Sequence, residues 1–296
     1  MDFNFDNALT NSLQEVDKKV YKTDDRFYVL KKDEQKNGAA LIRFLPSELF
    51  EDGTMSTVKK VYKYNVRSKT GKAFIAEWSP STIGKSDPIQ EKWQKLWNAG
   101  QQEEARRYAR SERYIANIKI INDTKVPENN GKIFLLDMSK TLYEKIKGIM
   151  EPTAQDIALG KKAKNLFNPV NGYNFLLIAK EGANGMVTYN DSDAAQDANS
   201  IYANIDEAVK EIKEKCYKLS DWDKEEAYPT YEFLKSELDR IDNNQSQKVE
   251  TIETTQAPAQ TASFVAQEVS TQTSQAPAAG ASSTNDLDAL INSLGK

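Results

Sequence analysis

The sequence predicts a mixed, β-rich fold, a Greek-key barrel of the OB type with inserted helices. Three observations lead to this fold class. Short apolar segments bounded by turn residues recur between residues 25 and 241. Helical patterns interrupt them irregularly, whereas a doubly wound sheet needs regular βαβ alternation. After Ile241 the composition changes to Gln, Thr, Ser, Ala and Pro, so we expect the core to occupy residues 25–241.

Each predicted strand is a short apolar run next to a turn signal. Pro46 ends the first strand, and Ser68-Lys-Thr-Gly71 joins the next two into a hairpin because Gly71 can adopt positive φ. The predicted strands span 39–45, 61–67, 72–78, 114–121, 132–136 and 173–180.

Predicted helices begin behind N-capping residues. Asp87 precedes Pro88, and Ser139 and Asn204 precede periodic apolar stretches. The expected helices extend from Asp87 to Gly100, from Gln101 to Arg110, from Ser139 to Met150, from Asn204 to Ser220 and from Tyr231 to Ile241.

The two ends of the chain are predicted to lie outside the core. Residues 1–24 form a helical arm in this prediction, because four apolar side chains recur at helical spacing: Leu9, Leu13, Val16 and Val20. Residues 242–285 are expected to be disordered, since they offer too little apolar surface to offset the entropy of ordering.

Residues 286–296 form a separate, acidic peptide with one apolar stripe. Leu287, Leu290, Ile291 and Leu294 stand at i, i+3, i+4 and i+7. This spacing predicts a short amphipathic helix that binds a groove on another protein. The alternative is a helix that folds back onto the chain's own core.

Composition excludes several classes of function. The 296 residues include one cysteine, Cys216, and no histidine, which excludes a disulfide framework, a Cys/His zinc site and a Ser-His-Asp triad. Phosphate-binding glycine motifs are absent from the sequence, and no apolar run reaches 18 residues. We therefore expect a protein without a cofactor, without contact to a membrane, in the cytoplasm.

Basic residues are concentrated in the middle of the chain. The net charge is −4, yet residues 57–120 contain 14 Lys and Arg against 6 Asp and Glu, whereas residues 242–296 contain 6 acids and 2 bases. Aromatic residues lie among these cations, most densely in Tyr108-Ala-Arg-Ser-Glu-Arg-Tyr114. Cations for phosphates and flat rings for bases are what sequence-tolerant binding of a single strand requires.

Three other readings remain open on the residues alone. The rings could fill the core while the lysines only solvate a face. The basic face could serve an adaptor that binds acidic proteins. A metal-dependent nuclease could use Asp191 and Asp193, because paired carboxylates can hold Mg²⁺.

Several motifs, in order, resemble the single-stranded DNA-binding, helix-destabilising proteins of T-even-type phages. The motifs cover about residues 38–190 and the last eleven, and Pro127 to Lys132 is the most specific. They are Leu41-Ile-Arg-Phe-Leu-Pro-Ser47, Tyr114-Ile-Ala-Asn-Ile118, Pro127-Glu-Asn-Asn-Gly-Lys132, Tyr143-Glu-Lys-Ile146, Gly172-Tyr-Asn-Phe175, Tyr189-Asn-Asp191 and Asp286-Leu-Asp-Ala-Leu290.

The resemblance implies a non-enzymatic protein with a DNA cleft in an OB-fold core. It also implies self-association along DNA through the arm, and recruitment of phage replication, recombination and repair proteins through the tail, in the infected bacterial cell. Tyr114 and Tyr189 would stack on bases, and Arg110 would contact phosphate. Further DNA contacts are predicted for Arg43, Arg106, Arg107, Tyr108 and Arg113.

Two departures from the family pattern carry predictions. In the stretch that resembles the family's zinc ribbon, Trp78, Asp87 and Gln90 occupy cysteine positions. We therefore expect no zinc, with packing of Trp78, Trp93 and Trp97 in its place. The arm also lacks the family's basic motif, since its first basic residue is Lys18, which weakens the expectation of self-association.

Overall fold

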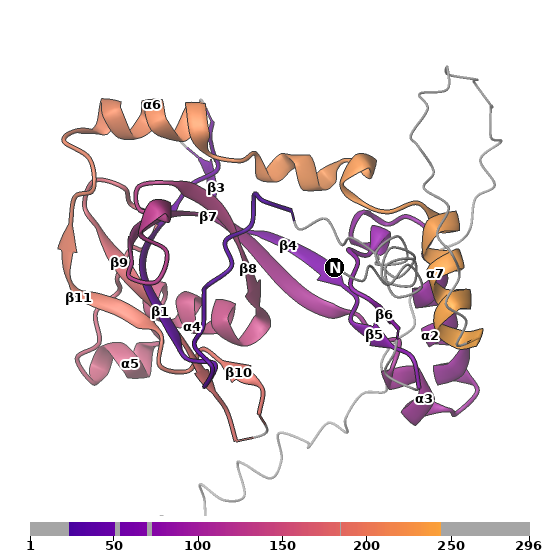
Figure 1. Ribbon diagram of the computed structural model, residues 1–296. Coiled ribbons are helices and arrows are strands. Elements are labelled where there is room, and N and C mark those ends of the chain that lie inside the picture. The colour runs from indigo at the N-terminus through magenta and orange to yellow at the C-terminus, as the bar shows by residue number, and fades with distance from the viewer. Residues whose placement is uncertain (1–23, 51–53, 70–72, 184, 244–296) are drawn as a thin grey trace, which may run out of the picture. The chain divides into compact units, whose positions relative to one another are not determined.

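The computed structural model describes residues 24–50, 54–69, 73–183 and 185–243, which contain a seven-stranded antiparallel sheet with helices against it (Figure 1). The strands are β1 (Gly38–Leu45), β2 (Glu48–Leu49), β3 (Met55–Ser56), β4 (Lys59–Lys63), β5 (Val66–Arg67), β6 (Phe74–Ile75), β7 (Ser111–Asp123), β8 (Ile133–Ser139), β9 (Gly172–Glu181), β10 (Val187–Thr188) and β11 (Asp193–Asn199). The helices are η1 (Pro80–Ile83), α2 (Pro88–Asn98), α3 (Gln102–Arg106), η2 (Pro127–Asn129), α4 (Lys140–Met150), α5 (Ala154–Ala158), α6 (Ile205–Lys215), η3 (Leu219–Asp223), η4 (Glu225–Ala227) and α7 (Tyr231–Asn243). The predicted mixed, β-rich class is confirmed.

Strand β7 is the strand of the sheet with which β1, β4 and β8 all pair. β8 pairs with it along one edge, from Arg113 opposite Ser139 to Lys119 opposite Ile133. The other edge is shared, because β4 pairs with the first residues of β7 and β1 pairs with the last. β1 then pairs with β9, which pairs with β10 and β11.

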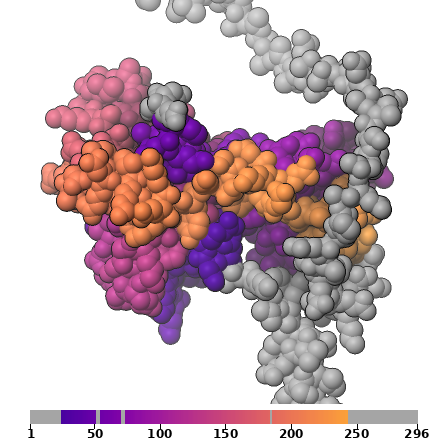
Figure 2. Space-filling view, turned by 90° about the horizontal axis from the view of Figure 1, so that it is seen from above, coloured from indigo at the N-terminus to yellow at the C-terminus, as the bar shows by residue number. Residues whose placement is uncertain are grey.

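Side chains along β7 alternate between the two faces of the sheet. Ala116, Ile118 and Ile120 point into the main cluster, where α4 contributes Leu142 and Ile146. Their neighbours point to the opposite face, as the period of two in a strand requires. On that face Lys119 forms an ion pair of 2.5 Å with Glu211 of α6. The segment from α6 to α7, orange in both views, crosses the described part of the chain (Figures 1 and 2).

A smaller unit follows β4. Its core consists of buried residues from the residue after β4, the β5–β6 hairpin, α2, α7 and the segment after α3: Tyr64, Val66, Ile75, Ile89, Tyr108, Leu234, Leu238 and Ile241. The predicted hairpin is confirmed, since Val66 pairs with Ile75 and Arg67 with Phe74. The first hairpin strand was predicted too long, however, because Val61 to Lys63 pair with β7 instead.

Several predicted boundaries differ from the structure, among them the ends of α3, α6 and α7. α3 ends at Arg106, and Arg110 lies between it and β7. α6 ends at Lys215, because Asn117 of β7 exchanges two hydrogen bonds of 2.9 Å with the backbone of Tyr217 and so holds the chain extended. α7 continues beyond Ile241, and Asp242 accepts a hydrogen bond of 2.8 Å from the Tyr108 hydroxyl.

Several predictions concern residues that are not described. Residues 1–23 of the predicted arm, residues 244–285 of the predicted linker and the peptide with Leu287, Leu290, Ile291 and Leu294 lie outside the described residues. Of the helices that the structure describes, none is long and apolar enough to cross a lipid bilayer.

Candidate nucleic-acid interface

A first hollow of about 340 Å³ lies where the start of β7 meets the β5–β6 hairpin. Its lining combines cations with an exposed ring, Phe74, which is 39% exposed. Neither Arg67 nor Phe74 was among the predicted DNA contacts. The hollow is lined by Lys63, Tyr64, Asn65, Arg67, Phe74, Ala76, Ser111, Arg113 and Asp137.

One carboxylate holds two cations in this hollow. Asp137 accepts a hydrogen bond of 2.6 Å from Nε of Arg113 and one of 3.2 Å from Nζ of Lys63. The Lys63 ammonium also lies 4.2 Å from the ring centroid of Trp78. The side chains are therefore fixed in place, while one positive charge remains uncompensated and available to a phosphate.

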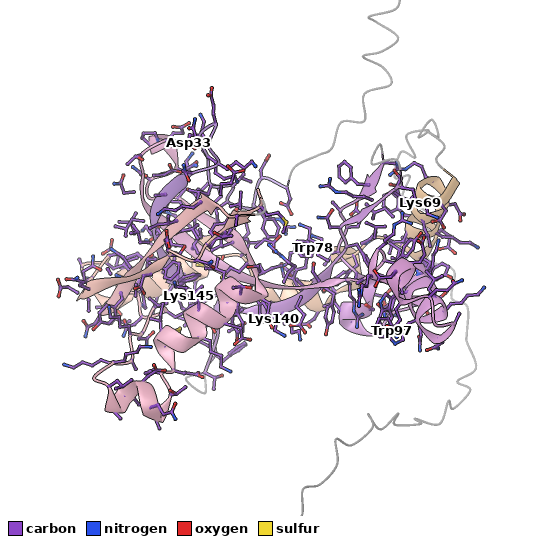
Figure 3. The ribbon with its side chains drawn as sticks, turned by 90° about the horizontal axis from the view of Figure 1, so that it is seen from below. Asp33, Lys69, Trp78, Trp97, Lys140 and Lys145 are labelled. Atoms are coloured by element: carbon purple, nitrogen blue, oxygen red, sulfur yellow. The ribbon has the colours of Figure 1, made fainter. Side chains whose placement is uncertain are left out.

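The same arrangement recurs beside the first turn of α4. Glu112 accepts from Lys60 at 2.7 Å and lies 3.2 Å from the ammonium of Lys140. Hydrogen bonds from Lys60 and then Lys140 lower the pKa of Glu112 to about 2, so this carboxylate stays charged. Lys140 projects from α4 at the surface (Figure 3).

Tyr114 and Tyr143 form a parallel ring stack next to these lysines. Their centroids are 3.8 Å apart and the ring planes differ by 8°. Tyr114 is only 7% exposed, so it supports its neighbour rather than presenting a free ring. Half-buried Tyr143 is the ring that can meet a base, and it was missed as a contact although its motif was recognised.

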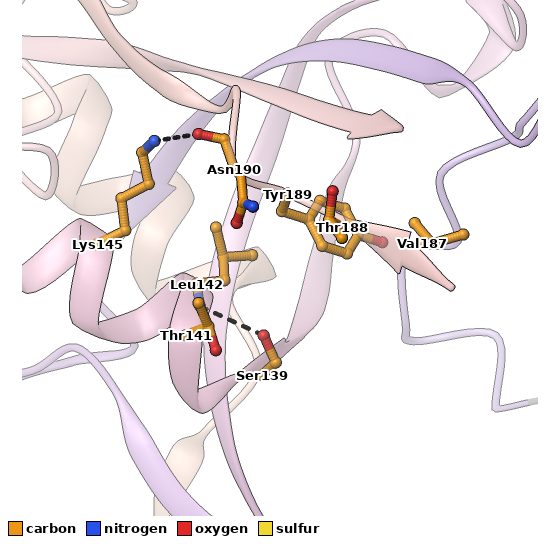
Figure 4. Close-up of a pocket in the computed structure, with 8 residues that line it drawn as sticks. All are labelled: Ser139, Thr141, Leu142, Lys145, Val187, Thr188, Tyr189 and Asn190. Carbon is orange, nitrogen blue, oxygen red and sulfur yellow. Dashed lines mark hydrogen bonds between the residues drawn. The ribbon is translucent and has the colours of Figure 1, made fainter. Parts of the chain in front are cut away.

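A second hollow of about 420 Å³ contains the predicted Tyr189 (Figure 4). The Tyr189 ring is half-buried, and burial raises the pKa of its hydroxyl. On the other side of Leu142, the ammonium of Lys145 donates to the backbone oxygen of Asn190. A ring, several hydroxyls and one ammonium fit a base and its phosphate. The lining residues are Ser139, Thr141, Leu142, Lys145, Val187, Thr188, Tyr189 and Asn190.

Arg43 and Tyr108, which were both predicted to contact DNA, lie in the interior of the protein, where neither side chain is accessible to a strand. Arg43 is 0% exposed, and its guanidinium donates to Asn174 Oδ1, to the Asn168 carbonyl and to both oxygens of Asn199. Burial lowers the pKa of Arg43 to about 10, which leaves it charged at neutral pH. Tyr108 is 2% exposed in the core of the smaller unit.

The remaining predicted arginines have partners within the protein. Arg106 and Arg107 pair with Glu103 and Glu104 at 2.6 Å each. The guanidinium of Arg110 lies 3.9 Å from the centroid of Tyr62 and donates to Ser81. Of the four predicted arginines 106, 107, 110 and 113, Arg113 lines the first hollow.

A buried carboxylate network occupies the stretch that resembles a zinc ribbon. Asp87 caps α2 by accepting from the backbone of Ile89 and Gln90. Its other oxygen accepts from the hydroxyls of Tyr64 at 2.9 Å and Ser79 at 2.5 Å. Three metal-ligating side chains do not cluster anywhere in the described residues.

The tryptophans pack in different places. The ring centroid of Trp78 lies 5.0 Å from that of Trp222 and 5.9 Å from that of Phe27. Trp93 packs against the core of the smaller unit and stacks on the more exposed Trp97. The sequence did not reveal that Asp87 joins the start of α2 to Tyr64 and Ser79.

We expect Asp87→Ala to lower the free energy of unfolding by about 2–4 kcal/mol, because the helix loses its cap and two buried hydroxyls lose their acceptor. Asp87→Asn keeps the cap and should lose less. Urea unfolding with and without a chelator measures both effects, and the chelator should not move the wild-type midpoint. Stoichiometric zinc in the purified protein would contradict this account.

Comparison with known proteins identifies the family of this chain. A family model described as gp32 DNA binding protein like matches residues 36–242, which contain the whole sheet, both hollows and the tyrosine stack. The single-stranded DNA-binding proteins of Enterobacteria phage T4 and Enterobacteria phage T2 are each 31% identical to this chain over 219 residues, or 72% of this chain and 68% of each relative. The chain therefore belongs to the gp32 DNA-binding-protein-like family.

Proposed function

We propose that this chain binds single-stranded DNA without sequence preference, along the two hollows and the tyrosine stack between them. The observation that carries the proposal is the repeated pairing of rings with cations that exceed their carboxylates: Lys63 and Arg113 at Asp137, and Lys60 and Lys140 at Glu112. Phosphates meet the surplus charge, and bases stack on Tyr143, Tyr189 and Phe74. Both named relatives are single-stranded DNA-binding proteins, which supports this.

The site residues of this proposal combine expected and newly found side chains. Tyr189 and Arg113 are retained from the sequence, and Arg106, Arg107 and Arg110 are proposed as outer phosphate contacts that would exchange their internal partners for DNA. Tyr114 is proposed to act through Tyr143.

A binding titration with fluorescent homopolymers across a range of salt tests the proposal. We expect similar affinity for different deoxyhomopolymers, falling with salt at a slope of about −0.7 for each phosphate neutralised. A complex that ignores salt, or no complex with oligo-dT at all, would favour the adaptor with a basic face.

The function is proposed to be binding rather than catalysis. Of the two carboxylates considered for a nuclease, Asp191 pairs with Lys180 at 2.6 Å and Asp193 accepts from the adjacent backbone of Ala194. Intact single strands after incubation with Mg²⁺ and the protein are the expected result.

Finer features of the proposal follow from the sequence and the resemblance. The sheet would be an OB-type barrel variant, flanked by the arm, the linker and the peptide at 1–24, 242–285 and 286–296. Preferential binding would coat single strands and remove hairpins by mass action in the infected cell. The apolar stripe of the final peptide would recruit phage replication, recombination and repair proteins, and any self-association along DNA would involve the arm.

A further inference from the structure

A third hollow, of about 490 Å³, lies at the end of α4 and against α5. Four lysines line it, and none was among the predicted DNA contacts. Its lining residues are Glu144, Lys145, Gly148, Ile149, Pro152, Asp156, Lys161, Lys162, Lys164 and Asp193.

Helix α4 connects this hollow to the proposed DNA path. Its N-cap, Ser139, lines the second hollow, and Gly148 near its end lines the third. Lys145 belongs to the lining of both hollows. Lys140 and Lys145 project from this helix in Figure 3. A strand that leaves Tyr189 therefore has a continuous surface to follow.

The lysines of the third hollow differ in whether a carboxylate neutralises them. Lys161 pairs with Asp156 at 2.5 Å. Lys164 donates at 2.8 Å to the carbonyl of Ala195, which fixes the ammonium without neutralising it. For Lys162, no carboxylate of the described residues lies within ion-pair distance. Lys145, Lys162 and Lys164 thus keep uncompensated charge.

Two of the three carboxylates of this hollow accept hydrogen bonds from residues close to them in the sequence. Asp156 accepts from the backbone and hydroxyl of Thr153 as part of a capping box, in addition to Lys161. Asp193 accepts from the backbone of Ala194 at 2.7 Å. The hollow has four lysines and three acids, which gives it a net charge of +1. It should therefore bind an isolated phosphate weakly.

We propose that this hollow is a further phosphate-binding subsite, which takes the backbone of single-stranded DNA after the strand has passed Tyr189. The inference rests on the proposed function. A weak subsite of this kind gains from tethering, because a strand already held in the cleft presents its next phosphates at high local concentration. Long oligonucleotides should use the hollow, and short ones should not reach it.

The double variant Lys161→Ala/Lys162→Ala tests the subsite. Both side chains are exposed, so the fold should be unaffected. A matched control, Lys210→Ala/Lys213→Ala, removes the same charge from exposed positions on α6. Affinity is measured for oligo-dT of about 4 to 16 nucleotides, the range of single OB-type sites, at 50 and 200 mM salt.

We expect the affinity of the double variant to stop rising at a shorter oligonucleotide length than the affinities of the wild type and the control. For the longest oligonucleotide the variant should also lose about 7-fold less affinity between the two salt concentrations. Two fewer phosphates are then neutralised, one by Lys162 and one by Lys161, which would exchange Asp156 for the strand. Identical length and salt profiles for the variant and wild type would overturn the subsite while leaving the proposed function intact. Equal loss in variant and control would also overturn it. Failure of wild type to bind any oligonucleotide would instead overturn the proposed function.

Discussion

Replacing Arg43 by alanine should lower the free energy of unfolding by about 3–5 kcal/mol. The side chain is fully buried and its guanidinium joins β1 to β9, β11 and the Asn168 turn through four acceptors. Truncation leaves these acceptors without a donor and opens a cavity, and both effects destabilise the fold. Chemical denaturation followed by circular dichroism measures the loss.

The conservative variant Arg43→Lys separates charge from geometry. Lysine keeps the charge but cannot direct donors along three separate lines, so it should restore only part of the stability. DNA affinity of the folded fraction should match wild type, because no donor of Arg43 faces the proposed path. A stable Arg43→Ala protein with weakened DNA binding would return Arg43 to the interface.

The second large effect is expected in DNA binding. We expect Tyr143→Ala combined with Tyr189→Ala to weaken oligo-dT binding by at least about 30-fold, since each stacked base contributes roughly 1–3 kcal/mol. The two rings come from different elements, Tyr143 from α4 and Tyr189 from the chain directly after β10, so their contributions should add. Equilibrium titration at fixed salt measures the effect.

Two controls make the stacking interpretation specific. Phenylalanine at both positions keeps the rings and should retain most of the affinity. Phe50→Ala removes a ring that is 51% exposed directly after β2 and that lines none of the three hollows described above, so it should not change the affinity for DNA. Full affinity in a folded double alanine variant would exclude these tyrosines as the base platform.

The sequence predicted most elements because their signals are local. The side chains of Asp87 before Pro88 and Ser139 before α4 cap helices by accepting from backbone N–H groups two or three residues later, and the structure contains both caps. The ends of elements depended on distant partners instead. α6 ends early because Asn117, about 100 residues earlier in the chain, binds the backbone of Tyr217.

The sequence predicted which kinds of residue form the candidate site, but it predicted the individual positions less well. A basic, aromatic stretch indicates a class of ligand, yet exposure depends on tertiary packing. Arg43 and Tyr114 lie in recognised motifs, but the sheet buries one and Tyr143 covers the other. Conversely, the third hollow combines α4, α5 and β11, which no local pattern could bring together.

The sharing of one carboxylate by two cations has a kinetic consequence. In the proposed interface Asp137 and Glu112 hold their cationic partners in position before DNA binds, so a strand would meet ordered donors and little side-chain freedom would be lost. When a phosphate departs, the same carboxylate is already in place to share the released cation. Dissociation can therefore proceed one contact at a time, which favours a short residence time and ready handover of the strand.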